Sequence, residues 1–571
     1  MIRKIAVLGF CTLLVAGCGR DEAESPVPGD TASDAGTGSA DATNTLFNRI
    51  DADTAWLMAN IETMPEDLSE KLWAPLQSMA DLNRETYNTI ADELDEAPVA
   101  AAILREFAQI DSREAFVERG LEPNGHWAIH AVSLYPFVHW ELSDPEAFRA
   151  TLDRIAAEAE TELTWREVED VEVLWAEMED VGLALSYDDH FATVAIVPEN
   201  DALLRRVANL DQPATAYDSD DLERFASDRG YTPYASGYME FGRIVDQLLD
   251  GDDAMLAAAR ESSPLGAIAG NEACRAELDA LVDLFPRATL GYTDVSESFM
   301  AFDMTVEADA EFAERMQVIA DTPVDLDRED AGVLEFGLAL NIVGARDFAR
   351  EIVASWVETP PQCELFESIR ANAEDWQMAL NQPIPPVVTN FNGLRMNLER
   401  ISLDDNSNVE SAEGSLALFM RNPQMMLGMA QMFSPELAAV QLEPGGDPQP
   451  LPANVIPNMP EGISAFMGLG EAALGLAVGE AEKDRLNESM DPGEGGNAIL
   501  SYGINFAGYA DALGNVMANM QEQLEAMGEE AAASDPSEAM AALAEVYDYT
   551  EASMHLTERG IEFRSTMTLK E

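Results

Sequence analysis

Histidines and clustered carboxylates are the side chains with which this chain could hold a metal ion or transfer protons. Two of its five histidines, His126 and His130, are four residues apart, a spacing that would place both on one face of a helix. The segment Trp127–Val132 alternates in the way typical of a strand, on which the two imidazoles would stand about 13 Å apart. Because that distance is too great for one ion, the sequence predicts no histidine-based metal site.

Motifs of the common enzyme classes are absent from the sequence. No Gly-x-Ser-x-Gly, Ser-x-x-Lys or His-Glu-x-x-His occurs, and no Gly-rich phosphate loop opens a helix. The segment Asp404–Asn408 has oxygen side chains at alternate positions, but Val409 stands where a calcium loop needs glycine, so a hairpin turn is expected. The sequence therefore predicts no cofactor, no metal and no enzyme; a hydrolase with an unrecognised acidic site is an alternative.

One apolar stretch, residues 423–433, is unusually rich in methionine. Methionine is flexible and polarisable, and it adapts to ligands and partners of irregular shape. The pattern predicts a helix whose methionines form the wall of an apolar pocket, with ordinary core packing as the competing interpretation. The candidate pocket residues are Met425, Met426, Met429 and Met432.

The amino terminus has the features of an export signal. Arg3 and Lys4 precede an apolar run, Ile5–Val15, that is too short to span a bilayer, which takes about 20 residues. The run ends in Val-Ala-Gly-Cys18, which resembles the lipobox of bacterial lipoproteins. The resemblance implies that residues 1–17 are a signal peptide, removed on export, and that Cys18 carries diacylglycerol and palmitate.

The resemblance also implies a location in the cell envelope. A protein with two or three acyl chains is stably held at a membrane without spanning it. Gly19 follows the cysteine where an Asp often signals retention at the inner membrane, so the periplasmic face of the outer membrane is expected. The chain as a whole resembles the large uncharacterised envelope lipoproteins of Gram-negative bacteria.

Two further cysteines, Cys274 and Cys363, each stand at the start of a helical pattern. An exported protein folds in a compartment that permits disulfides, and the two occupy matching places in repeated units of the chain. We therefore expect them to be bonded; two separate buried thiols are the alternative. Neither has a second Cys or His at ligand spacing, which argues against a metal or redox role.

Acidic residues dominate the charge: 106 Asp and Glu face 33 Lys and Arg, for a net charge of −73. Repulsion of this size destabilises a compact chain unless salt screens it, so an adaptation to a salty habitat is expected, with cation binding as an alternative. Nucleic acid is excluded as a partner, because phosphate binding requires clustered basic residues. An anionic membrane would also repel the chain, so the membrane is expected to be a partner only through the N-terminal lipid.

The remaining pattern predicts an α+β fold in two lobes, with repeated units of antiparallel strands and helices packed on one face. Residues 18–45 are small and polar, which predicts a disordered tether that follows the acylated cysteine. The lobes are expected at 46–325 and 326–571. A strand that leads into an amphipathic helix recurs at Tyr238–Leu248, Leu338–Phe348 and Tyr502–Leu513, and a looser copy begins at Val138.

Paired strands are expected after each of the three closer copies. The expected pairs are 288–292 with 299–306, 394–398 with 414–419, and 552–556 with 560–567. A further strand at Phe191–Val197 is echoed by Ala473–Val478.

The leading functional hypothesis is a lipid-anchored envelope protein with a non-enzymatic role in binding or assembly, with envelope proteins as partners. A carrier or sensor of an apolar ligand or lipid, built around the methionine-rich helix, is the alternative.

Overall fold

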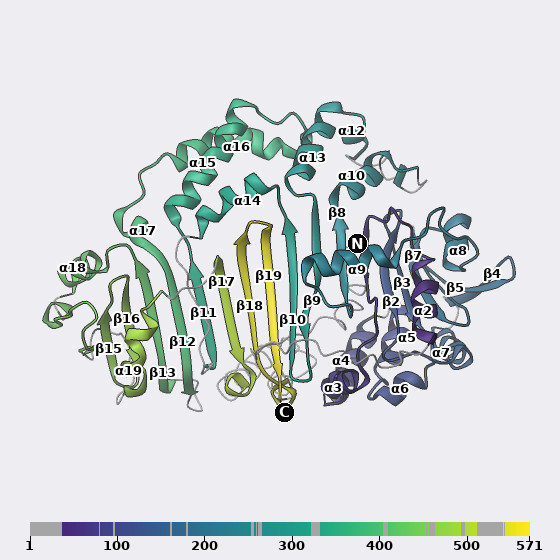
Figure 1. The fold of residues 1–571 in the computed structure, drawn as a ribbon, viewed down its shortest axis with the longest axis horizontal. Helices are drawn as coiled ribbons and strands as arrows, with labels where there is room; N and C mark the ends of the chain where they lie inside the picture. Colours follow the sequence, from purple (N-terminus) through teal and green to yellow (C-terminus); the bar gives the residue numbers. More distant parts are fainter. Residues whose placement is uncertain are drawn as a thin grey trace. The chain divides into compact units, whose positions relative to one another are not determined.

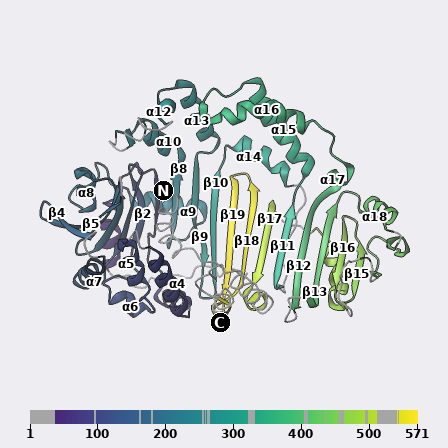
Figure 2. The ribbon, with the colours of Figure 1, turned by 180° about the vertical axis from the view of Figure 1, so that it is seen from behind.

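The computed structural model describes residues 37–570 apart from 79, 95–97, 160–162, 179–180, 253–255, 258–259, 261–264, 321–331, 404–408, 435, 453–454, 456–462, 493–496, 511–540 and 542. The chain divides into two compact units (Figures 1 and 2). Unit 1 contains the residues up to Glu272 and Pro286–Met304, and unit 2 contains Ala273–Phe285 and Thr305–Lys570. The boundary predicted between 325 and 326 lies outside the described residues. No helix in the described part has the length and apolar character needed to cross a bilayer.

Unit 1 is built on one sheet, in which every pairing between β9 and β4 is antiparallel. In spatial order its strands are β10 (Phe299–Glu307), β9 (Arg287–Val295), β8 (Ser236–Glu240), β1 (Trp56–Ala59), β2 (Trp127–Val132), β3 (Tyr135–Glu141), β7 (Phe191–Val197), β6 (Val181–Tyr187), β5 (Val171–Met178) and β4 (Leu163–Val168).

Helices cover both faces of this sheet near β5, whereas the sequence predicts them on one face. Val173 and Trp175 of β5 pack with α8, and Leu174 and Ala176, which point the other way, pack with α5 and α7. The helices of the unit are α2 (Thr37–Phe47), α3 (Glu66–Ser78), α4 (Ala80–Glu93), α5 (Pro98–Phe107), α6 (Arg113–Val117), α7 (Pro145–Glu158), α8 (Asp201–Val207), α9 (Ser219–Arg229), α10 (Phe241–Asp250) and α12 (Leu265–Ala269).

Unit 2 repeats this construction with antiparallel strands of its own. Its strands in spatial order are β19 (Gly560–Leu569), β18 (Tyr547–Thr557), β17 (Ala498–Asn505), β11 (Leu334–Ala339), β12 (Phe391–Leu403), β13 (Val409–Met420), β16 (Ala473–Val478), β15 (Ala465–Leu469) and β14 (Gln449–Pro450). Its helices are α13 (Glu272–Leu284), α14 (Ala310–Met316), η1 (Gln317–Ile319), α15 (Ile342–Glu358), η2 (Glu364–Phe366), α16 (Glu367–Leu380), α17 (Pro386–Asn390), α18 (Pro423–Phe433), η3 (Leu437–Ala439) and α19 (Glu480–Ser489).

The strands of the two units share one topology. In unit 1, β1 pairs with β2 and β8, β2 with β3, and β3 with β7; in unit 2, β11 pairs with β12 and β17, β12 with β13, and β13 with β16. Each unit then ends in three successive paired strands, β8–β9–β10 and β17–β18–β19. This shared order is typical of an internal duplication.

The α+β class and the three strand pairs expected from the sequence are confirmed. Leu394 faces Leu418 and Leu398 faces Gly414, as the alternation of β12 and β13 predicts. The echo between Phe191–Val197 and Ala473–Val478 is confirmed as β7 and β16, which hold equivalent places in the two units.

The recurring pattern is only partly a structural repeat. Tyr238 and Tyr502 lie in the equivalent strands β8 and β17. Leu338, however, lies in β11, the equivalent of β1, and Val138 lies in β3, the equivalent of β13.

The predicted disordered tether is wrong in its last part, where the structure has helix α2. The sequence places residues 18–45 in a disordered tether, whereas a helix begins at Thr37. The two residues that end the helix, Leu46 and Phe47, are buried against Leu57 and Leu222. Burial of these two side chains contributes roughly 2 kcal/mol each, which explains why a small and polar segment is ordered beside them. Residues 18–36 lie outside the described part of the chain.

Candidate functional site

The predicted disulfide is confirmed. The sulfur atoms of Cys274 and Cys363 are 2.11 Å apart and their Cα atoms are 4.4 Å apart, and both residues are buried in unit 2. The bond joins α13 to the segment before η2. The Glu277 carboxylate on α13 strengthens the junction, because it accepts hydrogen bonds from the backbone N–H groups of Gln362 and Cys363 at 2.6 and 3.0 Å. The predicted lipidation site, Cys18, lies outside the described residues.

The methionine-rich segment forms α18, whose start is firmly positioned. Asn422 caps the helix, because its side-chain oxygen accepts a hydrogen bond from the Met425 N–H at 2.9 Å, and Pro423 occupies the first turn. Asn390 in turn accepts from the Asn422 N–H and donates to its carbonyl oxygen. One side of the helix packs on the sheet, where Leu427 is buried with Met420, Leu469 and Leu474.

The other side of α18 is an exposed apolar surface. We call the residues Met425, Met429, Met432 and Phe433, which are spaced to share one helix face, the α18 stripe. Met432 is 75% exposed, Phe433 is 88% exposed and Met425 is also exposed, whereas Met429 is partly buried. Met426 lies outside the stripe and packs against the buried cluster around Leu427. The four predicted pocket residues are thus divided between an exposed face and the sheet-facing side.

Phe433, the most exposed member, is a residue that the sequence analysis did not single out. Its only sequence signal is its position at the end of the apolar run, directly after Met432.

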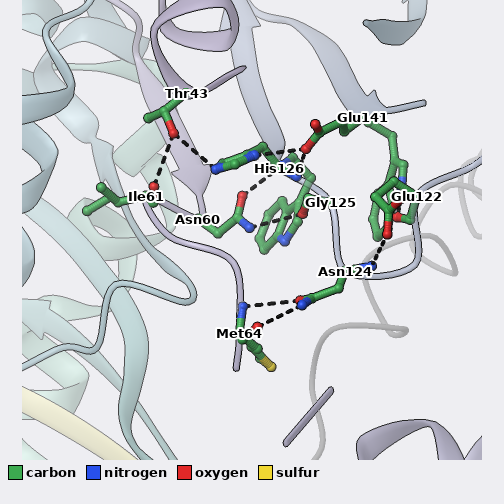
Figure 3. A network of polar contacts seen from close by, with 11 residues as sticks. Thr43, Asn60, Ile61, Met64, Glu122, Asn124, Gly125, His126 and Glu141 are labelled. Atoms are coloured by element: carbon green, nitrogen blue, oxygen red, sulfur yellow. Dashed lines mark hydrogen bonds and ion pairs between the residues drawn. The ribbon is translucent and has the colours of Figure 1, made fainter. Parts of the chain in front are cut away.

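The largest polar network around a histidine joins α2 to β2 and β3 (Figure 3). The Thr43 hydroxyl lies 3.0 Å from Nε2 of His126, and the His126 Nδ1 lies 2.8 Å from the Glu141 carboxylate. Burial alone would raise the pKa of Glu141, but hydrogen bonds from the side chain and backbone of His126 lower it. Asn60 continues the network, because it donates to the Gly125 carbonyl oxygen and accepts from the Trp127 N–H.

A hydroxyl, an imidazole and a carboxylate that are linked in this order also form the nucleophilic triad of some enzymes. His126, however, is only 2% exposed, and the Thr43 hydroxyl also contacts the Ile61 carbonyl oxygen at 3.4 Å. A substrate could not approach the imidazole through this packing. We therefore assign the network a structural role, in which it holds α2 on the sheet.

Two further histidines, His130 and His139, form a buried pair inside unit 1. Their Nε2 atoms are 3.1 Å apart, and the His139 Nδ1 lies 3.0 Å from the Thr193 hydroxyl. Burial lowers the pKa of His130 to about 3 and that of His139 well below 6.5. Both imidazoles are therefore neutral, and one Nε2 donates its proton to the other. Within the described residues, no cluster of three or more His, Cys, Asp or Glu side chains has the arrangement to hold a metal ion.

An apolar cavity in unit 1 is too small for a lipid. It lies between α5, α7 and the strands β5 and β6, and it is lined by Ile103, Leu152, Leu174 and Leu183 among others. Its volume is about 20 Å³, which is the space of one water molecule. A drug-sized ligand occupies a pocket of roughly 300–1,000 Å³. This cavity therefore does not support the hypothesis that the protein carries an apolar ligand.

Comparisons with known proteins yield little resemblance. No protein-family model matches the sequence, and no curated protein matches it. Crystal form III of TP0453 is 10% identical, covering 50% of this chain and 90% of that chain with a TM-score of 0.23. Crystal form IV of TP0453 is 12% identical, covering 46% and 80% with a TM-score of 0.21. Scores this low carry no argument about the fold or the function of this chain.

Proposed function

We propose that the protein is a lipid-anchored envelope protein that acts by binding another protein, without catalysis, at the periplasmic face of the outer membrane in a salt-adapted bacterium. The observation that carries the binding role is the α18 stripe. Exposed apolar side chains that are contiguous on one helix face mark interaction sites more often than isolated ones do. The signal and Val-Ala-Gly-Cys18 support the anchoring, and the charge of −73 supports the saline habitat.

The charged residues around α18 determine which kind of protein can bind at the stripe. Helix α18 has no charged residue, but the segments that pack around it carry the exposed carboxylates Glu436, Glu443 and Glu471. Apolar contact at the stripe must therefore be made by a surface whose rim is basic, because like charges around a contact cost binding energy. The partner that fits is a protein with an apolar groove edged by Lys or Arg.

The first test is of the anchor. In a Cys18→Ser chain, we expect no fatty acid to be incorporated, residues 1–17 to be retained, and the protein to leave the membrane fraction in salt washes, because one hydrophobic signal alone anchors weakly. The measurement is the intact mass of the chain after metabolic labelling with a fatty-acid analogue. Cys11→Ser is the matched control and should be processed normally. A native chain without acyl mass would refute the anchor.

The second test is of the stripe. A photo-crosslinking residue at position 432 should give one discrete protein adduct in native membranes, and a Phe433→Glu substitution should abolish it. The same crosslinker at position 378 is the matched control, because Met378 is also exposed, on α16, but lies outside the stripe. Because Phe433 is exposed, the substitution should change the free energy of unfolding by less than about 0.5 kcal/mol. Equal adducts from both positions, or adducts with lipid alone, would contradict the proposal.

A further inference from the structure

A polar groove opens in unit 1 between the end of α2 and the segment that follows α8, apart from the α18 stripe and independent of it. Its volume is about 390 Å³, within the range of small-molecule sites. Its polar lining residues are Asn48, Asn209 and Gln212, which carry carboxamides, together with Thr45 and Arg49. The other lining residues are a proline and an alanine, so the lining contains no carboxylate. This is unusual in a chain with 106 acidic residues.

Two carboxylates in the hydrogen-bond network around the groove are each paired with an arginine. Asp188 pairs with Arg49 at 2.7 Å, and Asp51 pairs with Arg206 at 2.6 Å. Burial opposes ionisation of Asp188, but the charge of Arg49 and the backbone N–H groups near it lower its pKa, so the pair consists of two full and opposite charges. These two pairs therefore add no net charge beside the groove.

A third pair lies at the far end of the same wall. Arg205 contacts both oxygens of Asp211, at 2.7 and 2.8 Å, directly before Gln212 in the chain. A bidentate pair of this kind fixes geometry as well as charge. It holds the segment that carries Gln212 against α8.

The backbone places the carboxamides where they line the groove. Asn209 follows the C-cap of α8 in the left-handed region, at φ 54°, a conformation that asparagine tolerates and that turns the chain sharply. Its side chain donates to Asp188 at 3.2 Å and accepts from the Gln212 carboxamide at 2.9 Å. On the opposite wall, Asn48 follows α2 and is exposed to solvent.

Two backbone hydrogen bonds tie these walls together. The Ala52 N–H donates to the Thr215 carbonyl oxygen at 3.0 Å, and the Tyr217 N–H donates to the Ile50 carbonyl oxygen at 2.9 Å. The groove is therefore formed in the folded chain and does not depend on a ligand to bring its walls together.

We propose that this groove binds a neutral saccharide. A cation would find no carboxylate in the lining, and an anion would find Arg49 already paired with Asp188. Carboxamides and a hydroxyl each offer both donors and acceptors, which is the capacity that sugar hydroxyls and acetamido groups require. Pro213 and Ala216 supply the small apolar surface on which the face of a sugar ring rests.

The test uses the purified full chain in high salt and sugars that differ in charge on the same ring. The neutral probes are glucose, galactose, mannose and N-acetylglucosamine; glucosamine is the cationic probe and glucuronate the anionic one. Saturation-transfer NMR and calorimetry measure binding. We expect at least one neutral sugar to bind in preference to both charged ones.

A double substitution, Asn48→Ala with Gln212→Ala, should weaken that binding by about tenfold or more, since each lost hydrogen bond contributes roughly 1 kcal/mol. Gln109→Ala is the matched control, because Gln109 is also an exposed carboxamide with one local hydrogen bond, to the Arg105 carbonyl oxygen, and does not line the groove. The thermal unfolding of each variant verifies that it folds. Failure of every neutral sugar to bind, tighter binding of a charged one, or undiminished binding by the double variant would overturn the proposal.

Discussion

Removal of the disulfide should lower the free energy of unfolding of unit 2 by about 4 kcal/mol, because the bond closes a loop between residues that are 89 apart in sequence. A double Cys274→Ser, Cys363→Ser chain avoids the buried single thiol that one substitution would leave. The effect should be local to unit 2, where α13 would lose its covalent attachment to the segment that precedes α16. Denaturant unfolding in high salt measures the size of the loss, and hydrogen exchange resolved by segment measures its location.

Two comparisons make this result decisive. Protection from hydrogen exchange in the unit 1 strands β2 and β3 should stay as in the native chain, since neither strand belongs to the unit that holds the bond. Native chain treated with a reductant should reproduce the behaviour of the double variant. Equal stability of the oxidised and reduced chains would show that the bond contributes nothing to folding. Equal losses in both units would show that they do not unfold separately.

Acid should destabilise unit 1 through the buried histidine pair. Each imidazole has a lower pKa in the folded chain than the value of 6.5 expected in the unfolded chain. Below pH 6.5 the unfolded chain therefore binds protons that the folded chain does not bind. Stability is therefore complete above pH 6.5 and is lost as the pH falls toward about 3. His130 alone accounts for roughly 4–5 kcal/mol over that range, at about 1.4 kcal/mol per pH unit. The measurement is the free energy of unfolding at a series of pH values between 7 and 5, above the range in which most carboxylates titrate.

The charges near the pair reinforce this direction. The charges of His130, Arg49 and Arg206 add to the effect of burial in lowering the pKa of His139. At His130, the hydrogen bond with the Ala131 carbonyl oxygen opposes burial, and the charge of Arg206 adds to it. A His130→Gln chain should lose about half of the pH dependence and retain a hydrogen-bonding side chain beside His139. His190→Gln is the matched control for the loss of a histidine outside the pair, since His190 is exposed in the turn between β6 and β7. A native chain equally stable at pH 7 and pH 5 would contradict the prediction.

Local patterns predicted those parts of the fold that local physics determines. The strand pair β12–β13 was predictable because its apolar residues alternate over a long stretch, so that one register places Leu394 opposite Leu418 on the same face. The disulfide was predictable because Cys274 and Cys363 are the two cysteines outside the N-terminal signal pattern, and each stands at the start of a helical pattern. In both cases the deciding information lies within a short segment or in residue type alone.

Features that depend on distant packing were not predictable. The segments that pack over α18 decide whether its methionines line a pocket or contact solvent. The hydrophobic periodicity of the sequence does not show which segments those are. The groove is formed where Asn48 meets Gln212, and these residues are brought together only by the completed sheet of unit 1. The order of α2 likewise depends on Leu57 and Leu222, which are remote in sequence from Phe47.

The shared topology of the two units allows α18 to be compared with the equivalent helix of unit 1. In unit 1 the helix after the third strand is α7, and its apolar residues, such as Leu152, are covered by α5 and the sheet. The equivalent helix after the third strand of unit 2 is α18, which packs on its own sheet but leaves Met432 and Phe433 bare. The apolar side of the helix that completes the core in unit 1 is thus left exposed at the equivalent helix of unit 2.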